Sequence, residues 1–253
     1  MKIIALANEK GGVAKTTSCY NLAWVKAKEG KRVCMVDLDP QASLTISAGL
    51  NAASDEYQNR NITALFNPKT DPAECVYTVD ASDLDTLYII PSNIGLAKME
   101  MQLFTMSTRE KRLKRALAKL ESYFDYIFLD CPPQLGLLTI NALVAADEVL
   151  IPCATDYLSY MGLQALLDTI KDFQTDPDLN PQLKIDGIIA TKYAKQINDQ
   201  RDVLELMRQL QPVIGIIKRT ADVSRDVYLG KPVVQTHPTS DPATEYTKIA
   251  AQI

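Results

Sequence analysis

The sequence predicts an α/β protein with a doubly wound, mostly parallel sheet flanked by helices. Short apolar runs alternate with helical patterns along the whole chain of 253 residues, and such runs are typical of parallel strands that are buried on both faces. A glycine-containing turn separates the first run from the first helical stretch, as in a strand–turn–helix unit. No linker or repeat interrupts this alternation, so we expect one domain over residues 1–253.

The first unit covers a strand at residues 3–7, a helix at about 16–29 and a strand at 32–39. Both strand segments are mostly apolar, and Gly30 is placed to end the helix as a C-cap. Since crossover connections are right-handed, the two strands should lie parallel in one sheet. The second strand ends in carboxylates, at the edge where open α/β sheets bind ligands.

The middle of the chain has a weaker pattern. Residues 50–83 are rich in Asn, Asp, Ala and Thr and should form loops and short helices, and residues 87–90 form a third strand. Ser107 and Glu110 have the spacing of a capping box, which predicts a helix from there to about Tyr123. One face of this helix would carry Leu113, Leu117 and Leu120.

The second half repeats the alternation, beginning with a strand at residues 126–130. Further strands are expected at 148–152, 185–190 and 213–217, and helices at about 137–146, 159–174 and 198–210. Ser240 precedes a final helix with Pro242 near its first position, a common arrangement at a helix start.

The composition excludes several classes of protein. Apolar residues make up 47% of the chain, but they form no run long enough to span a membrane and no signal peptide. The five cysteines are scattered, which suggests reduced thiols in the cytoplasm. A single histidine, His237, argues against a histidine-based catalytic centre. The net charge of −4 argues against a dedicated nucleic-acid domain but permits a local basic patch.

Residues 10–17 have the chemistry of a phosphate cradle. Backbone N–H groups of a turn and the positive end of a helix dipole converge on one anion at such a position. Lys15 would add a charge for the terminal phosphates, and the Thr16 hydroxyl would hold Mg²⁺. The candidate phosphate-binding residues are Lys10, Gly11, Gly12, Val13, Ala14, Lys15, Thr16 and Thr17. The alternative is a plain glycine turn with two solvated lysines.

The cradle departs from the standard P-loop pattern. That pattern requires glycines where this chain has Glu9 and Ala14, and the chain carries a second lysine, Lys10, five residues before Lys15. The segment resembles the deviant Walker A box, K-G-G-x-x-K-[ST], of the ParA/MinD family of ATPases. The resemblance implies a P-loop NTPase fold of the deviant Walker type. Ala14 replaces the commoner glycine, a small-for-small change that a tight loop can accept if the φ of this residue is negative.

Three aspartates follow apolar strands and should meet at the ligand-binding edge. Asp130 ends a strand in the manner of a Walker B residue that orients Mg²⁺, and alternation places Asp37 and Asp39 on one face. Residues 36–41 resemble the family's switch I motif, which implies that Asp39 prepares the attacking water and that Asp37 is structural. The implied metal-site residues are Thr16, Asp39 and Asp130. The alternative is that each aspartate caps its own loop.

The resemblance also implies a mode of action with ATP and Mg²⁺ as cofactors. Lys10 would reach the nucleotide of a second subunit, so that ATP drives formation of a homodimer. The dimer of a ParA protein coats nonspecific DNA, and a centromere-binding, ParB-like adaptor triggers hydrolysis. The catalytic residues would be Lys10, Lys15 and Asp39, and Thr191 and Lys218 would contact the base.

The residues indicate ATP hydrolysis more specifically than they indicate what the ATPase acts on. The C-terminal segment lacks the basic amphipathic pattern of a membrane anchor. DNA contacts would come from Lys218, Arg219 and Arg225, or from a basic cluster that is alternatively a solvated helix face. The cluster comprises Arg109, Lys111, Arg112, Lys114, Arg115 and Lys119. The competing functions are a protein-positioning ATPase without a DNA role and a metabolic P-loop ligase.

Overall fold

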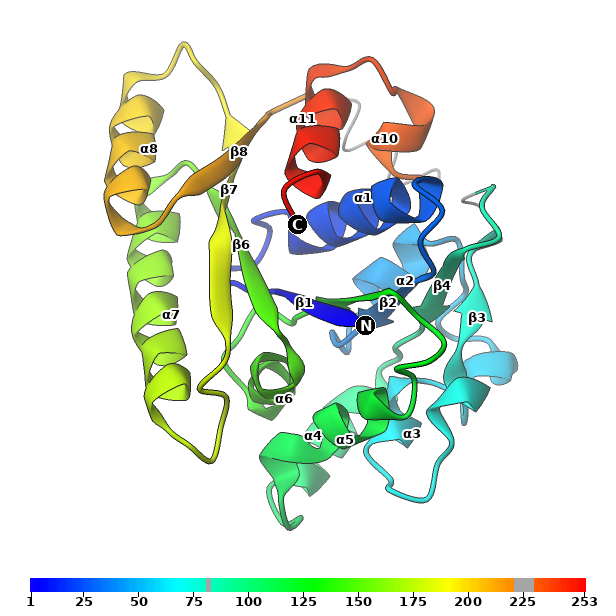
Figure 1. Ribbon diagram of the computed structural model, residues 1–253. Helices are drawn as coiled ribbons and strands as arrows, with labels where there is room; N and C mark the ends of the chain where they lie inside the picture. Colours follow the sequence, from blue (N-terminus) through cyan, green and yellow to red (C-terminus); the bar gives the residue numbers. More distant parts are fainter. Residues whose placement is uncertain (81–82, 221–229) are drawn as a thin grey trace.

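A single sheet organises the computed structural model, which describes residues 1–80, 83–220 and 230–253 (Figure 1). In these residues eight strands lie in the order β3-β4-β2-β5-β1-β6-β7-β8. The strands are β1 Lys2–Leu6, β2 Val33–Asp37, β3 Tyr77–Thr78, β4 Leu87–Ile90, β5 Tyr126–Asp130, β6 Glu148–Ala154, β7 Lys184–Tyr193 and β8 Val213–Lys218. Only the β3–β4 pair of the described sheet is antiparallel. The predicted doubly wound, mostly parallel sheet is confirmed.

Helices cover both faces of this sheet. Figure 1 places α1, α10 and α11 over one face and α6, α7 and α8 over the other. The helices are α1 Lys15–Lys28, α2 Ser43–Ser47, α3 Ile62–Leu65, α4 Gly95–Leu103, α5 Arg112–Ala118, α6 Leu137–Ala145, α7 Tyr157–Thr175, α8 Asn198–Leu210, α10 Val233–Thr236 and α11 Asp241–Ala250, with 3₁₀ turns η1 Asp55–Tyr57, η2 Pro72–Cys75 and η4 Arg109–Lys111. None of the described helices combines the length and the apolarity that a membrane crossing requires.

The alternation of side chains along each strand divides the core into two layers. In β1, Ile3 and Ala5 join the cluster that includes the buried side chains of α6 and α7, whereas Ile4 and Leu6 pack with those of α1 and α11. Successive strand residues point to opposite faces, so a strand buried on both sides must be apolar throughout. This explains the continuous apolar runs of the sequence.

Phe128 in β5 should be one of the positions where truncation is most costly. Its side chain is fully buried in the layer beneath α1, and truncation there leaves a cavity that the sheet cannot close. We expect Phe128→Ala to lower the free energy of unfolding by about 3–5 kcal/mol, measured by urea denaturation. Tyr123→Ala, at an exposed ring, is the control and should cost less than about 1 kcal/mol.

The capping box predicted at Ser107 and Glu110 is wrong. Thr108 adopts a left-handed conformation (φ 49°), and the Glu110 carboxylate accepts a hydrogen bond from Arg109 Nε. The start of α5 is capped instead by buried Asn141 of α6, whose Oδ1 accepts the Leu113 N–H at 3.1 Å. The helix also ends at Ala118, before the predicted Tyr123. Leu113 and Leu117 of its predicted apolar face are buried as expected, and so is Leu120, which lies beyond the end of the helix.

Helix α4 and strand β3 were not predicted from the sequence. In α4 only Leu96 and Leu103 are buried, while Met101 is exposed, so its apolar residues do not mark one inward face. Strand β3 has two residues at the edge of the sheet, too few for a period to be visible. The rest of the described part of residues 50–83 forms loops and short helices, as predicted.

Candidate active site

The turn between β1 and α1 forms a compact loop at the carboxyl edge of the sheet. Gly12 and Ala14 both have left-handed backbones, with φ of 72° and 69°. The negative φ under which the loop would accept alanine without strain is therefore not observed at Ala14. Alanine in this region costs roughly 1–2 kcal/mol relative to a right-handed conformation, which gives a physical reason for glycine being the commoner residue there. The Ala14 carbonyl accepts the Ser18 N–H at 2.9 Å, at the start of α1.

Lys15 begins α1 with its side chain folded back under the loop. Its ammonium donates to the carbonyl oxygens of Asn8 at 3.0 Å and Lys10 at 3.1 Å. Burial lowers the pKa of Lys15 below its ordinary value, while the nearby Asp130 carboxylate opposes this shift. The arrangement holds a buried cation at the opening of the loop, where it can face an anion.

Thr16, in the first turn of α1, contacts Asp130, the last residue of β5. The Thr16 hydroxyl donates to Asp130 Oδ2 at 2.7 Å, and Asp130 Oδ1 is buried without a hydrogen-bond partner. Burial, followed by the charge of Asp37, raises the pKa of Asp130 well above its ordinary value. A hydroxyl and an unsatisfied carboxylate oxygen are ligands that Mg²⁺ favours. These residues therefore fit the predicted metal site.

Asp37 and Asp39 have different environments, because Asp37 is the last residue of β2 and Asp39 lies two residues beyond it. Asp37 is fully buried and accepts hydrogen bonds from the Thr45 N–H at 2.8 Å and the Thr45 hydroxyl at 2.7 Å. Burial raises its pKa to about 6 against the effect of these bonds. Asp39 lies beyond the end of β2, so strand alternation does not apply to it, and it lines the cavity described below. Its Oδ1 accepts the Gln41 N–H at 2.9 Å.

Lys10 lies at the outer end of the loop and is held by Asp156 of the same chain. The Lys10 Nζ to Asp156 Oδ1 distance is 2.7 Å, and the two side chains are 35% and 47% exposed. Burial raises the pKa of Asp156, but hydrogen bonds from Lys10 and Ser159 outweigh it and leave the pKa below its ordinary value. Asp156 also caps α7. No local pattern predicts this pair, because its partners are 146 positions apart along the chain.

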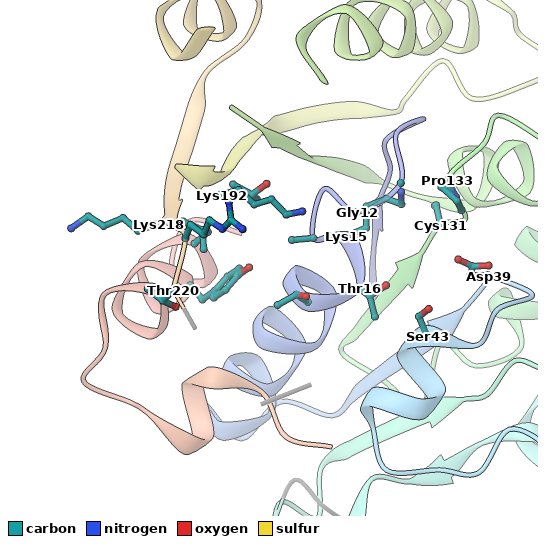
Figure 2. A pocket seen from close by; sticks show the side chains of 17 residues that line it. Gly12, Lys15, Thr16, Asp39, Ser43, Cys131, Pro133, Lys192, Lys218 and Thr220 are labelled. Carbon is teal, nitrogen blue, oxygen red and sulfur yellow. The ribbon is translucent and has the colours of Figure 1, made fainter. Parts of the chain in front are cut away.

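The loop and the strand ends enclose a cavity of about 510 Å³. Figure 2 shows side chains of the loop, of β7 and β8 and of the Asp39 segment around it. Its walls are formed by Gly11, Gly12, Ala14, Lys15, Thr16, Thr17, Asp39, Ser43, Cys131, Pro133, Thr191, Lys192, Ile217, Lys218, Arg219, Thr220 and Tyr246. The lining residues that the sequence predicted as site residues are Gly11, Gly12, Ala14, Lys15, Thr16, Thr17, Asp39, Thr191, Lys218 and Arg219. The others were not predicted as such.

Some of the residues predicted to bind the nucleotide make contacts within the protein near the cavity. Val13 is buried, and its carbonyl accepts a hydrogen bond from the Thr191 hydroxyl at 3.0 Å, so Thr191 ties β7 to the loop. Thr191 lies within β7, because this strand continues to Tyr193, beyond its predicted end at residue 190. Lys218 forms an ion pair with Asp241 at 2.6 Å. Arg225 lies outside the described residues.

The basic cluster around α5 is largely engaged in holding neighbouring loops. Arg112 donates to the Phe66 and Ser107 carbonyls, and Lys119 donates to those of Pro68 and Thr70. These contacts favour a structural role for both residues over that of a freely solvated helix face.

A phosphate loop, a buried lysine and strand-end carboxylates define the class of P-loop ATPases. Residues 1–185 match the AAA domain family. The chain is 37% identical to the sporulation initiation inhibitor protein Soj of Bacillus subtilis, over all of this chain and 98% of that protein. It therefore belongs to the Soj/ParA family, and it is an ATPase of the ParA/MinD type.

Two solved structures support this assignment. A putative plasmid partition protein of Borrelia burgdorferi bound to AMPPNP is 25% identical, with a TM-score of 0.84, over 99% of this chain and 97% of that one. A cobyrinic acid a,c-diamide synthase of Mycobacterium smegmatis with bound ADP and magnesium is 33% identical, with a TM-score of 0.81, over 99% and 93%. The fold of this chain is thus compatible with nucleotide and Mg²⁺ binding.

Proposed function

We propose that this protein is an ATP-dependent partitioning ATPase that moves DNA, with residues 1–253 acting as one ATPase domain in the cytoplasm. The observation that carries the proposal is the pair of lysines on one phosphate loop. Lys15 is buried, with its ammonium on carbonyls of the loop, whereas Lys10 is partly exposed and is paired with Asp156. One lysine can serve the nucleotide of its own chain, and the other is available to a second chain.

In this proposal ATP lies in the cavity with its phosphates against the loop amides of residues 10–17. Lys15 places a positive charge at the terminal phosphates, and Thr16 and Asp130 hold Mg²⁺ with Asp39 nearby. Mg²⁺ would neutralise charge on the β- and γ-phosphates. Asp39 orients the attacking water and accepts its proton, while buried Asp37 fixes the backbone that carries Asp39 through a hydrogen bond to the Asp39 N–H at 3.0 Å.

Lys10 completes the site across a homodimer. Its ion pair with Asp156 is partly exposed, and pairs of this kind are worth only about 0–1 kcal/mol. A triphosphate on a facing subunit is a stronger partner for the ammonium. Exchange of Asp156 for that phosphate would couple ATP binding to dimerisation, and hydrolysis would release the dimer.

The dimer is proposed to bind nonspecific DNA weakly and so to associate with the nucleoid. Its hydrolysis would be stimulated by a centromere-binding, ParB-like adaptor. Lys218 and Arg219 are exposed at the end of β8, and dimerisation would double this patch. Because DNA affinity comes mainly from phosphate contacts, a modest patch can suffice when it is repeated.

The test is binding to nonspecific duplex DNA with ATP, with ADP and without nucleotide, over a range of salt concentrations. We expect binding with ATP alone, weakening linearly on a log–log plot as salt rises. Arg219→Ala should weaken it and reduce the slope by about one unit, with ATP affinity measured separately because Arg219 also lines the cavity. The control is Lys31→Ala, at an exposed lysine just before β2, where the amino ends of the strands lie. Absence of ATP-dependent binding at low salt would contradict the DNA role.

That last outcome would favour the second candidate, a positioning ATPase with a protein cargo. The lysine pair and the dimer switch would operate in the same way, so only the cargo differs. A metabolic ligase is the third candidate, because one similar structure is named a synthase. Lys10 and the Asp37–Gln41 segment argue against a ligase. ATP hydrolysis that is stimulated by DNA, with no small-molecule acceptor present, would be further evidence against it.

A further inference from the structure

The lysines around the cavity differ in what their ammonium groups contact. Lys15 donates to two backbone carbonyls, and Lys218 is paired with Asp241. Lys192 also lines the cavity, and its ammonium has neither a hydrogen bond nor an ion pair with any residue that the structure describes. A cation left uncompensated beside a phosphate loop is suited to a negatively charged ligand.

The backbone of β7 aims Lys192 at the loop. Ala190 pairs with Ile216 and Tyr193 pairs with Lys218, so β7 has one residue more than β8 between these pairs. This bulge contains Lys192, whose φ is 56°. A β-bulge redirects a side chain relative to the regular alternation of the strand. As a result Lys192 points toward Gly12 (Figure 2), and a Cβ atom built on Gly12 would lie 3.8 Å from Lys192 Nζ.

We propose that Lys192 is a phosphate-binding residue that its own chain supplies to the bound nucleotide, above the Gly12 side of the loop. It contacts the β- and γ-phosphates, since the amides of the loop and Lys15 hold that part of the nucleotide. Lys15 lies beneath the phosphates and Lys192 covers them from β7. The inference rests on the proposed nucleotide position and is independent of the DNA role.

The conformation of Lys192 supports a functional reason for this residue. Left-handed positions in bulges favour glycine, and asparagine tolerates them better than other side chains do. Lys192 is exposed, and its ammonium has no hydrogen bond or ion pair with the described residues, so these contacts give the side chain no role in holding the fold. Strained residues that persist in this way tend to lie at binding sites.

The test measures the affinities of the full-length protein for ADP, ATP and AMP, with Mg²⁺, by titration calorimetry. Lys192→Met keeps the length of the side chain and removes the charge, and Lys192→Asn removes the charge but suits the left-handed backbone. Both should weaken ADP and ATP binding about tenfold at low salt, with AMP changed less than about twofold. Lys192→Arg should retain most of the affinity. Lys195→Met, at an exposed lysine outside the cavity, should match the native protein.

Three results would overturn the proposal. Unchanged ADP and ATP affinity in both neutral variants would show that the ammonium makes no contact. Loss in Lys192→Met but not in Lys192→Asn would identify a backbone effect. An equal loss for AMP would place Lys192 away from the β- and γ-phosphates. If the native protein bound neither ADP nor ATP, the proposed function would fail together with this inference, whereas a failure to bind DNA would leave it intact.

Discussion

Replacing Lys15 by glutamine is expected to abolish ATP and ADP binding, with Kd raised more than about a hundredfold. Lys15 is only 7% exposed in the native protein, so its interaction with a phosphate is weakly screened by water. Removing one partner of a buried, hydrogen-bonded charge pair, here the ammonium that faces the phosphates, costs about 2–5 kcal/mol of binding free energy. The measurement is a calorimetric titration with ATP and Mg²⁺, run beside a thermal unfolding curve.

The fold should survive this substitution, because the glutamine amide can still donate to the carbonyls that now accept from Lys15. Lys28→Gln is the matched control, at an exposed lysine in the last turn of the same helix. It should leave the affinity within about twofold of the native value. Tight ATP binding by a folded Lys15→Gln protein would show that the loop is not the phosphate cradle.

The features that the sequence predicted correctly each depend on a short, contiguous stretch of residues. Continuous apolar runs identified the parallel strands, because burial on both faces leaves no room for alternation. The spacing of Lys10 and Lys15 could be read directly, and Asp130 could be placed at the carboxyl edge because it ends an apolar run. Each of these inferences needs only local geometry and the rule that parallel strands share an edge.

What the sequence could not predict depends on residues that meet only after folding. Asp156 pairs with Lys10 across 146 positions, and Asn141 caps α5 by accepting the N–H of Leu113, 28 residues earlier in the chain. Lys192 faces Gly12 because of a bulge, and no periodicity marks a bulge in a single sequence. The left-handed Ala14 belongs to the same group, since loop closure imposes a φ that its side chain disfavours.

Replacing Asp39 by alanine is expected to leave ATP binding nearly unchanged and to lower the rate of hydrolysis by about 10²–10⁴-fold. This range is typical for loss of a group that accepts a proton in the transition state. Asp39 lines the cavity, while the backbone around it is held by Asp37 and Thr45, so the loop should keep its shape. Phosphate release and ATP affinity are measured on the same preparation.

The same variant tests the dimer switch. If hydrolysis resets the dimer, Asp39→Ala should accumulate as an ATP-bound dimer in gel filtration, whereas the native protein returns to monomer as ATP is consumed. Asp39→Asn separates the two roles of the side chain, because its amide oxygen can still accept the Gln41 N–H but cannot take a proton. Equal trapping by both variants would assign the effect to the carboxylate. A strictly monomeric Asp39→Ala protein that binds ATP would rule out the two-subunit site, and Lys10 would then have no function beyond its pair with Asp156.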